Sequence, residues 1–200
     1  RDYRVALGIY DEYCKGFGPP YIASPAYTAL RAAQKKIITT GPATEQHLTM
    51  LERFAPANAS SFSTQLSVLN NNPNMPMGSG GGTPEPGGLL LDEILNNGFA
   101  GTWRGPGITK LAIIITDAPA GGDNDNASAV DDTFLQSLAA TANSMGVQCI
   151  LLTTLSGGNY EAQLIGNNAG GAAVVAPTFN NISKDIITQI ENICTANEDL

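Results

Sequence analysis

The stretch KLAIIITDAPAGG, residues 110–122, joins an apolar run to a small, acidic, glycine-rich segment. An apolar run without polar alternation is typical of a strand that is buried on both faces, as in a parallel sheet. Asp117 follows this strand directly. Because ligands of doubly wound sheets bind at the carboxyl ends of the strands, Asp117 is a candidate ligand for a hard cation such as Mg²⁺. A helix cap or a turn would explain the same residue equally well.

The rest of the chain alternates between helix and strand patterns. Further strands are predicted at 3–10, 147–154 and 172–176. Helices are predicted at 25–36, 43–54, 87–98, 160–171 and 179–194, and one more begins at a capping box of Ser128 and Asp131 and carries Val130, Phe134, Leu138 and Met145 on one face. Residues 55–82 are polar and low in charge, which predicts a long irregular loop. The sequence therefore predicts a single α/β domain over 1–200, with a doubly wound, mostly parallel sheet and helices on both faces.

The chain is acidic, with 10 basic and 18 acidic residues and a net charge of −8. Nucleic acids and anionic membranes attract basic patches, so this balance argues against both as partners. No apolar run approaches the ~20 residues that a helix needs to cross a bilayer. We therefore expect no nucleic-acid ligand and no direct membrane span.

The cysteines and asparagines bear on where the protein works. Cys14, Cys149 and Cys194 are too few and too scattered for a disulfide scaffold or a zinc site. Cys149 lies in an apolar strand pattern, which predicts a buried, inert thiol, while Cys14 and Cys194 could form a disulfide. Asn-x-Ser triplets begin at Asn58, Asn126 and Asn181. They slightly favour an extracellular or cell-surface protein, or a virion component, over a cytoplasmic one.

Enzymatic motifs are missing from the sequence. It contains neither the GxSxG of a hydrolase nucleophile nor the GxxxxGK[ST] of a phosphate-binding loop. His47 is the sole histidine and lies in a polar stretch that is predicted to be helical, so we expect it on the surface. The sequence thus predicts that the protein is not an enzyme.

Two segments taken together resemble the von Willebrand factor A (VWA) family. GGGTPEPGGLLLDEIL, residues 80–95, places a GGT loop before a helix, and KLAIIITDAPAGG supplies a TD loop after a buried strand. In that family these loops provide two parts of a metal-ion-dependent adhesion site. YRVALGIYDE, residues 3–12, resembles the family's second strand. The family's first strand, which carries a DxSxS motif, has no counterpart here, and the resemblance leads us to expect it upstream of Arg1.

The resemblance implies a cation site made of oxygen ligands. On the family's pattern Thr83 and Asp117 are metal ligands, and the PE form found in integrin β-subunits adds Glu85. A hydroxyl and two carboxylates suit Mg²⁺ or Ca²⁺, and binding is conditional on the upstream DxSxS motif. Asp123 and Asp125 are candidate accessory Ca²⁺ ligands or solvated turn residues.

These expectations lead to three functional hypotheses. The first is a protein-binding or adhesion module, metal-ion-dependent through this site and completed by an acidic side chain of the partner. The alternative is a structural building block of an extracellular appendage or virion-like assembly, in which the metal site is degenerate. A weaker third hypothesis is a cytosolic VWA subunit of an ATP-driven or metal-inserting complex, against which the low lysine content argues mildly.

Overall fold

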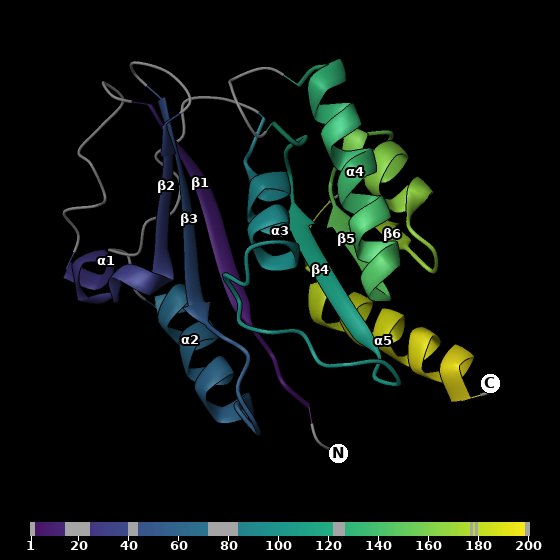
Figure 1. The fold of residues 1–200 in the computed structure, drawn as a ribbon, viewed down its shortest axis with the longest axis horizontal. Helices are drawn as coiled ribbons and strands as arrows, with labels where there is room; N and C mark the ends of the chain where they lie inside the picture. The colour runs from purple at the N-terminus through teal and green to yellow at the C-terminus, as the bar shows by residue number, and fades with distance from the viewer. Residues whose placement is uncertain are drawn as a thin grey trace. The chain divides into compact units, whose positions relative to one another are not determined.

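A computed structural model describes residues 3–14, 25–39, 44–71, 84–121, 127–176, 178 and 180–198. The chain divides into two compact units, whose helices and strands are labelled in Figure 1. The first unit holds the described residues up to Trp103, and the second holds those from Arg104 onward. Within the described residues, no helix has both the length and the apolar character needed to cross a membrane.

The first unit is built on a three-stranded antiparallel sheet. Its strands are β1 (Leu7–Cys14), β2 (Lys35–Thr39) and β3 (Thr44–Glu52), in the order β1-β3-β2. The central strand β3 pairs with both neighbours, and His47 faces Asp11 on one side and Ile37 on the other. Because side chains alternate across a strand, β3 sends Gln46, Leu48 and Met50 to one face of the sheet and His47, Thr49 and Leu51 to the other.

This sheet corrects three predictions. The strand predicted at 3–10 begins at Leu7 and is antiparallel to its neighbour, so it does not belong to a single parallel sheet. The helix predicted at 43–54 is wrong, because this segment is the central strand. The helix predicted at 25–36 is shortened to α1 (Pro25–Ala29), and a turn of 3₁₀ helix then leads into β2. The hydrogen bonds that β3 forms with a strand on each side outweigh the helical pattern of its own sequence.

Two helices complete the first unit. Helix α2 (Ala59–Asn71) occupies part of the predicted loop at 55–82, so that prediction is wrong over the helix, and 72–82 lie outside the described residues. Hydroxyl groups of α2 donate hydrogen bonds to carbonyls of the same helix; Thr64, for example, donates to the carbonyl of Ser60 at 2.9 Å. Helix α3 (Gly87–Leu95) confirms the helix predicted at 87–98.

The core of the first unit lies between the sheet and α3. Leu48, Met50, Leu90 and Ala100 are buried there. A Cβ atom at Gly8 would lie 2.9 Å from Cδ2 of Leu90, so a larger residue there would have to displace the end of this side chain. The ring centroid of Trp103, the sole tryptophan and the last described residue of this unit, lies 5.0 Å from that of Phe54.

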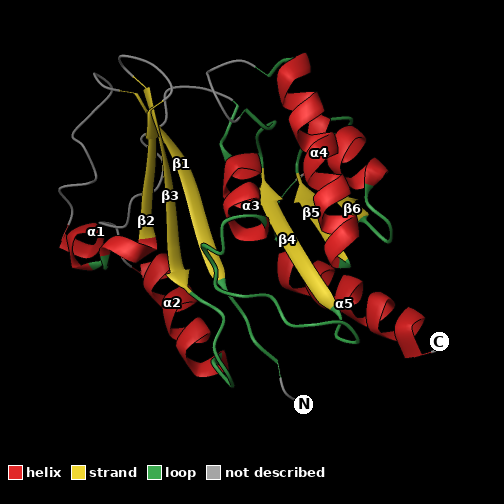
Figure 2. Ribbon diagram, in the orientation of Figure 1, coloured by secondary structure: helices red, strands yellow, loops and turns green. Residues whose placement is uncertain are grey.

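The second unit is built on a parallel sheet, as predicted for its strands. They are β4 (Lys110–Thr116), β5 (Val147–Thr153) and β6 (Ala172–Val175), in the order β4-β5-β6. Helix α5 (Ile182–Glu198) confirms the helix predicted at 179–194 and packs Ile182, Ile186 and Ile193 against Ile150 and Leu152. Helix α4 (Ala129–Met145) lies over β5 and β6 in Figure 2.

The ends of α4 follow from its sequence. Ser128 is the N-cap and forms the predicted capping box with Asp131, and Gly146 ends the helix at a φ of 66°. The buried face differs from the predicted one, because Leu135 and Leu138 are buried whereas Val130 is 64% exposed. A valine in the first turn lies beyond the edge of the sheet contact and gains little from facing inward.

The predicted helix at 160–171 is more irregular than expected. It is a π-helical turn (Tyr160–Leu164) followed by a 3₁₀ turn (Ile165–Asn167). The next residue, Asn168, holds the start of β5: its Oδ1 accepts from the N–H of Cys149 at 2.7 Å, and its Nδ2 donates to the carbonyl of Val147 at 3.1 Å. The amide of Asn168 thus forms the hydrogen bonds that a neighbouring strand would form with the start of β5.

The protein is therefore a mixed α/β protein with one antiparallel and one parallel sheet. The described strands form two sheets rather than the one doubly wound sheet that the sequence suggested.

Candidate functional site

The carboxyl end of the parallel sheet is shaped by two threonines. Thr116 ends β4 and Thr153 ends β5, and the two face each other in the register of the sheet. The hydroxyl of Thr116 accepts from the N–H of Ala118 at 3.1 Å, and that of Thr153 accepts from the N–H of Leu155 at 3.1 Å. Both strands thus end in the same side-chain turn, which fixes where the chain leaves the sheet.

An asparagine fixes the loop that follows β4. The amide of Asn159 accepts from the N–H of Ala120 at 2.9 Å and donates to its carbonyl at 3.0 Å. Asp117 lies between this clamp and the turn at Thr116. The hollow that Pro119, Thr153 and Asn159 help to line has a volume of about 10 Å³, too small for an organic substrate.

Asp117 is exposed, in contrast to the buried residues on either side of it. No group in the described part of the chain forms a hydrogen bond or ion pair with its carboxylate. It does not cap a helix, because α4 is capped by Ser128, and the turn after β4 uses the hydroxyl of Thr116. The two ordinary explanations of this aspartate therefore do not account for its side chain.

The other predicted ligands are placed less fully. Thr83, Asp123 and Asp125 lie outside the described residues. Glu85 precedes α3 in the first unit, where its carbonyl accepts from the N–H of Gly87 at 2.9 Å, whereas Asp117 belongs to the second unit. The convergence of Thr83, Glu85 and Asp117 on one ion stays a prediction. Among the residues that are described, no three His, Cys, Asp or Glu side chains lie close enough together to hold a metal.

A cluster of buried polar residues in the first unit was not foreseen. His47, predicted on the surface, is 2% exposed in the middle of β3, so that prediction is wrong. Its Nε2 lies 3.2 Å from Oε2 of Glu45, and its ring centroid lies 6.2 Å from that of Tyr27 in α1. Asp11, also buried, is its neighbour on β1, and the ammonium of Lys35 lies 4.8 Å from the ring centroid of Tyr27.

Burial dominates the protonation of this cluster. Desolvation lowers the pKa of His47, although its hydrogen bond to Glu45 and the charges of Glu45 and Asp11 act in the opposite direction. Desolvation also raises the pKa of Tyr27, and the charge of Glu45 adds to this. The alternation of polar and apolar residues in TEQHLTMLE is the one sequence signal that indicates a strand with a covered polar face.

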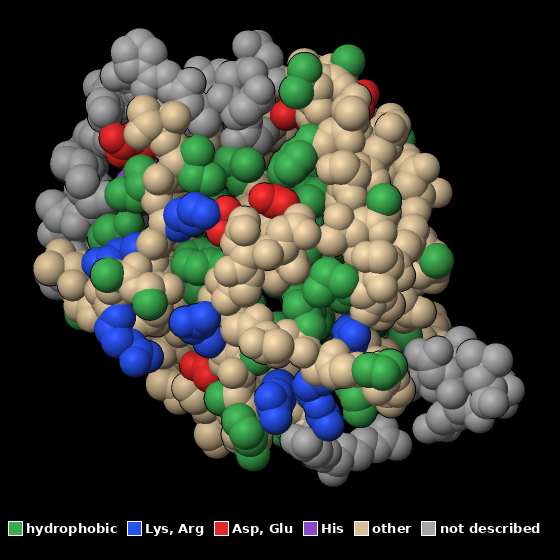
Figure 3. All heavy atoms as spheres, viewed as in Figure 1, with side chains coloured by type: hydrophobic (Ala, Val, Ile, Leu, Met, Phe, Trp, Pro, Cys, Tyr) green, Lys and Arg blue, Asp and Glu red, His purple; other side chains and the backbone are tan. Residues whose placement is uncertain are grey.

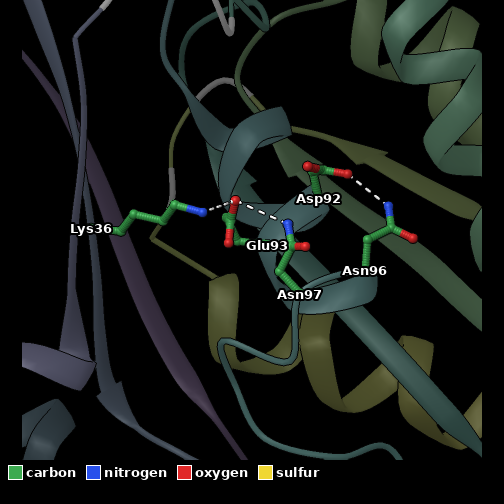
Figure 4. Close-up of polar contacts among 5 residues, drawn as sticks. All are labelled: Lys36, Asp92, Glu93, Asn96 and Asn97. Atoms are coloured by element: carbon green, nitrogen blue, oxygen red, sulfur yellow. Dashed lines mark hydrogen bonds and ion pairs between the residues drawn. The ribbon is translucent and has the colours of Figure 1, made fainter.

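A second polar network joins β2 to α3 (Figure 4). The buried carboxylate of Glu93 forms an ion pair with the ammonium of Lys36, and the same oxygen accepts from Nδ2 of Asn97 at 3.1 Å. Asp92 points to the other side of the helix and accepts from Asn96 at 2.7 Å. The network ties the edge strand to the helix that covers the sheet, so its role is structural.

Two further residues of interest have structural roles. Cys149 is fully buried, as predicted, and desolvation raises the pKa of its thiol to about 12. Cys14 and Cys194 have side chains outside the described part of the structure, so their pairing stays a prediction. Asn58, which begins one Asn-x-Ser triplet, is buried, and its amide makes four hydrogen bonds; in the folded protein it is not a glycan acceptor.

Comparisons with protein families, with curated proteins and with solved structures give no match to this chain.

Proposed function

We propose that the protein is a binding module that recognises a protein partner through the loops at the carboxyl end of its parallel sheet, with Asp117 as a ligand of Mg²⁺ or Ca²⁺. The observation that carries the proposal is the exposed Asp117 carboxylate, which has no hydrogen bond or ion pair within the described residues. A carboxylate placed at a rigid strand end is suited to a ligand from outside the chain.

The surroundings of Asp117 support a charged contact at the surface. The turn at Thr116 and the clamp on Ala120 hold the loop backbone, so little ordering remains when a partner binds. The small volume of the adjoining hollow favours a surface contact over an enclosed small-molecule site.

The residues fit a metal in their chemistry. The carboxylate of Asp117 is a hard oxygen ligand of the kind that Mg²⁺ and Ca²⁺ prefer. The bound cation would supply an electrophilic centre for an acidic side chain of the partner. Thr116 and Thr153 are not offered as ligands, because their hydroxyls are used by the turns.

Calorimetric titration of the protein with Mg²⁺ and with Ca²⁺ tests this proposal. We expect binding that Asp117→Asn weakens by at least about tenfold, because this change replaces a charged ligand by a neutral one of the same shape. Asp132→Asn, in the first turn of α4, is the matched control and should leave binding unchanged. Absence of metal binding, or equal binding by both variants, would refute the metal site and favour the structural building block.

A further inference from the structure

The topology of the first unit gathers positive charge at one end of its sheet. Strands β1 and β2 begin at the end of the sheet where β3 finishes, because β3 is antiparallel to both. Basic residues stand at each of these three positions. We call this group the basic end; it consists of Arg4 before β1, Arg31, Lys35 and Lys36 at the start of β2, and Arg53 after β3.

Hydrogen bonds hold these positions together. The amide of Asn58 donates to the carbonyl of Val5 at 2.7 Å and to that of Arg53 at 3.0 Å, which brings the residue after Arg4 beside Arg53. On the other side, Gln34 donates to the carbonyl of Met50 at 3.1 Å and accepts from the backbone N–H of Arg31 at 3.2 Å. The backbone at all three strand ends is therefore fixed.

The charge at the basic end is neutralised only in part. Arg4, Arg31 and Arg53 are exposed. Lys35 donates to the carbonyl of Tyr27 and Arg53 to that of Gly98, each at 3.1 Å, and these neutral acceptors leave the positive charge in place. In Figure 3, Lys and Arg side chains lie at separate points over this unit, with other side chains between them. Lys36 is paired with Glu93, and Glu52 hydrogen-bonds to Asn58 and Ser61, so an excess of positive charge remains in a chain with a net charge of −8.

We infer that the basic end is a docking surface for a short acidic segment of a partner protein. Neighbouring strands lie about 4.8 Å apart, so the three strands span roughly 10 Å across the sheet, and β2 begins opposite Thr49, three residues before β3 ends. In an extended peptide, side chains on one face repeat every ~6.7 Å, so two carboxylates separated by one residue fit within this span. Guanidinium groups bind carboxylates in a bidentate manner, which favours Asp or Glu at both positions.

The size of the basic end favours a peptide over a nucleic acid. Duplex DNA carries one negative charge for every ~1.7 Å of its axis and would extend far beyond a surface of roughly 10 Å. The remainder of this chain is acidic and repels such a polyanion. A short acidic segment ends before it meets that repulsion.

The inference is tested with a fluorescent peptide that has glutamate at alternate positions, Glu-Ser-Glu-Ser-Glu, by anisotropy at low and physiological salt. Arg31→Glu should weaken binding by at least about fivefold, because it places a like charge against the peptide. Lys184→Glu, on an exposed site of α5, changes the net charge by the same amount and should leave binding nearly unaltered. Arg4→Glu is a second variant in case the first lowers stability, which urea unfolding will show.

The test separates this surface from the proposed metal site. Peptide binding should persist with a chelator present and in Asp117→Asn. Loss of binding under either condition would overturn the inference, as would equal weakening by Arg31→Glu and Lys184→Glu. Tighter binding of a single-stranded oligonucleotide than of a peptide with equal charge would also overturn it.

Discussion

Replacing Asn58 by alanine should destabilise the first unit strongly. The Asn58 side chain is 7% exposed and joins the chain before β1 to the chain after β3. Its Oδ1 accepts from the N–H of Val5 at 3.0 Å, and its Nδ2 donates to the carbonyl of Val5, to Glu52 and to the carbonyl of Arg53. The two N–H bonds of Nδ2 are shared among three acceptors, so the amide makes the equivalent of about three hydrogen bonds; at about 0.5–1.5 kcal/mol each, their loss should cost about 1.5–4.5 kcal/mol.

Urea unfolding followed by tryptophan fluorescence measures this loss. Trp103 is the sole tryptophan and its ring packs against that of Phe54 at an interplanar angle of 59° in the same unit, so its emission reports on the part of the protein that the change affects. Ser60→Ala is the control, because it also removes the Asn-x-Ser triplet of Asn58 but changes an exposed side chain and leaves the Asn58 amide in place. It should change the free energy of unfolding by less than about 0.5 kcal/mol.

The comparison of alanine with aspartate at position 58 sharpens the test. Asn58→Asp keeps the acceptor for Val5 but loses every donor and places a carboxylate beside that of Glu52, which now lies 2.8 Å from Nδ2. It should therefore be at least as destabilising as alanine at neutral pH. A loss below about 0.5 kcal/mol for Asn58→Ala, or a stable aspartate variant, would refute the argument that the amide acts through its hydrogen bonds.

Three further predictions concern a histidine, a glycine and a cysteine. Burial lowers the pKa of His47, so below about pH 6.5 the unfolded chain binds a proton that the folded protein does not. The free energy of unfolding should therefore decrease on acidification by at most about 1.4 kcal/mol per pH unit, and His47→Gln should remove this part of the slope in urea titrations. Gly170→Ala should cost about 1–3 kcal/mol in thermal or urea unfolding, because its φ is 76° and a Cβ atom there would lie 2.6 Å from Nε2 of Gln148; an unchanged stability would contradict this. Cys149 should resist maleimide at pH 8 in the folded protein and react after unfolding, as peptide mapping by mass spectrometry will show, and rapid labelling of the native protein would count against its burial.

The second unit could be predicted from sequence because its signals are local. Apart from Lys110, Gln148 and the final threonines, KLAIIIT and VQCILLT are apolar, a pattern characteristic of parallel strands covered on both faces. Strand β5 is largely buried, whereas Ile115 of β4 is 43% exposed. Ser128 and Asp131 satisfy each other's helix-capping groups without help from the rest of the chain. Such features need no knowledge of which segments pair.

The first unit was misread because its structure depends on pairing between distant segments. In β3 both faces are covered, so Gln46, His47 and Leu48 are all buried, and the polar and apolar positions do not mark one exposed face. Helix α2 carries Phe62, Leu66 and Leu69 at helical spacing, but the serine, threonine and asparagine residues between them give the segment the composition of a loop. In both segments polar residues obscure the periodic pattern.

The candidate site was predicted in part. The position of Asp117 at a strand end follows from the apolar run before it. Its carboxylate has no partner among the described residues, because the hydroxyl of Thr116 accepts the backbone hydrogen bond of the turn instead. The basic end could not be seen in the sequence, because Arg4, Arg31 and Arg53 are brought together only by the antiparallel order of the strands.

Three asparagine side chains that hold backbone groups also bear on the chemical stability of the protein. Asn58, Asn159 and Asn168 each use the oxygen and the nitrogen of one amide to hold backbone groups. Slow hydrolysis of such an amide to a carboxylate keeps the acceptor but turns the donated hydrogen bond into a repulsive contact between two oxygens. A single chemical event at any clamp would release a strand end or a loop, so the working lifetime of this fold depends on how well these amides are shielded from water.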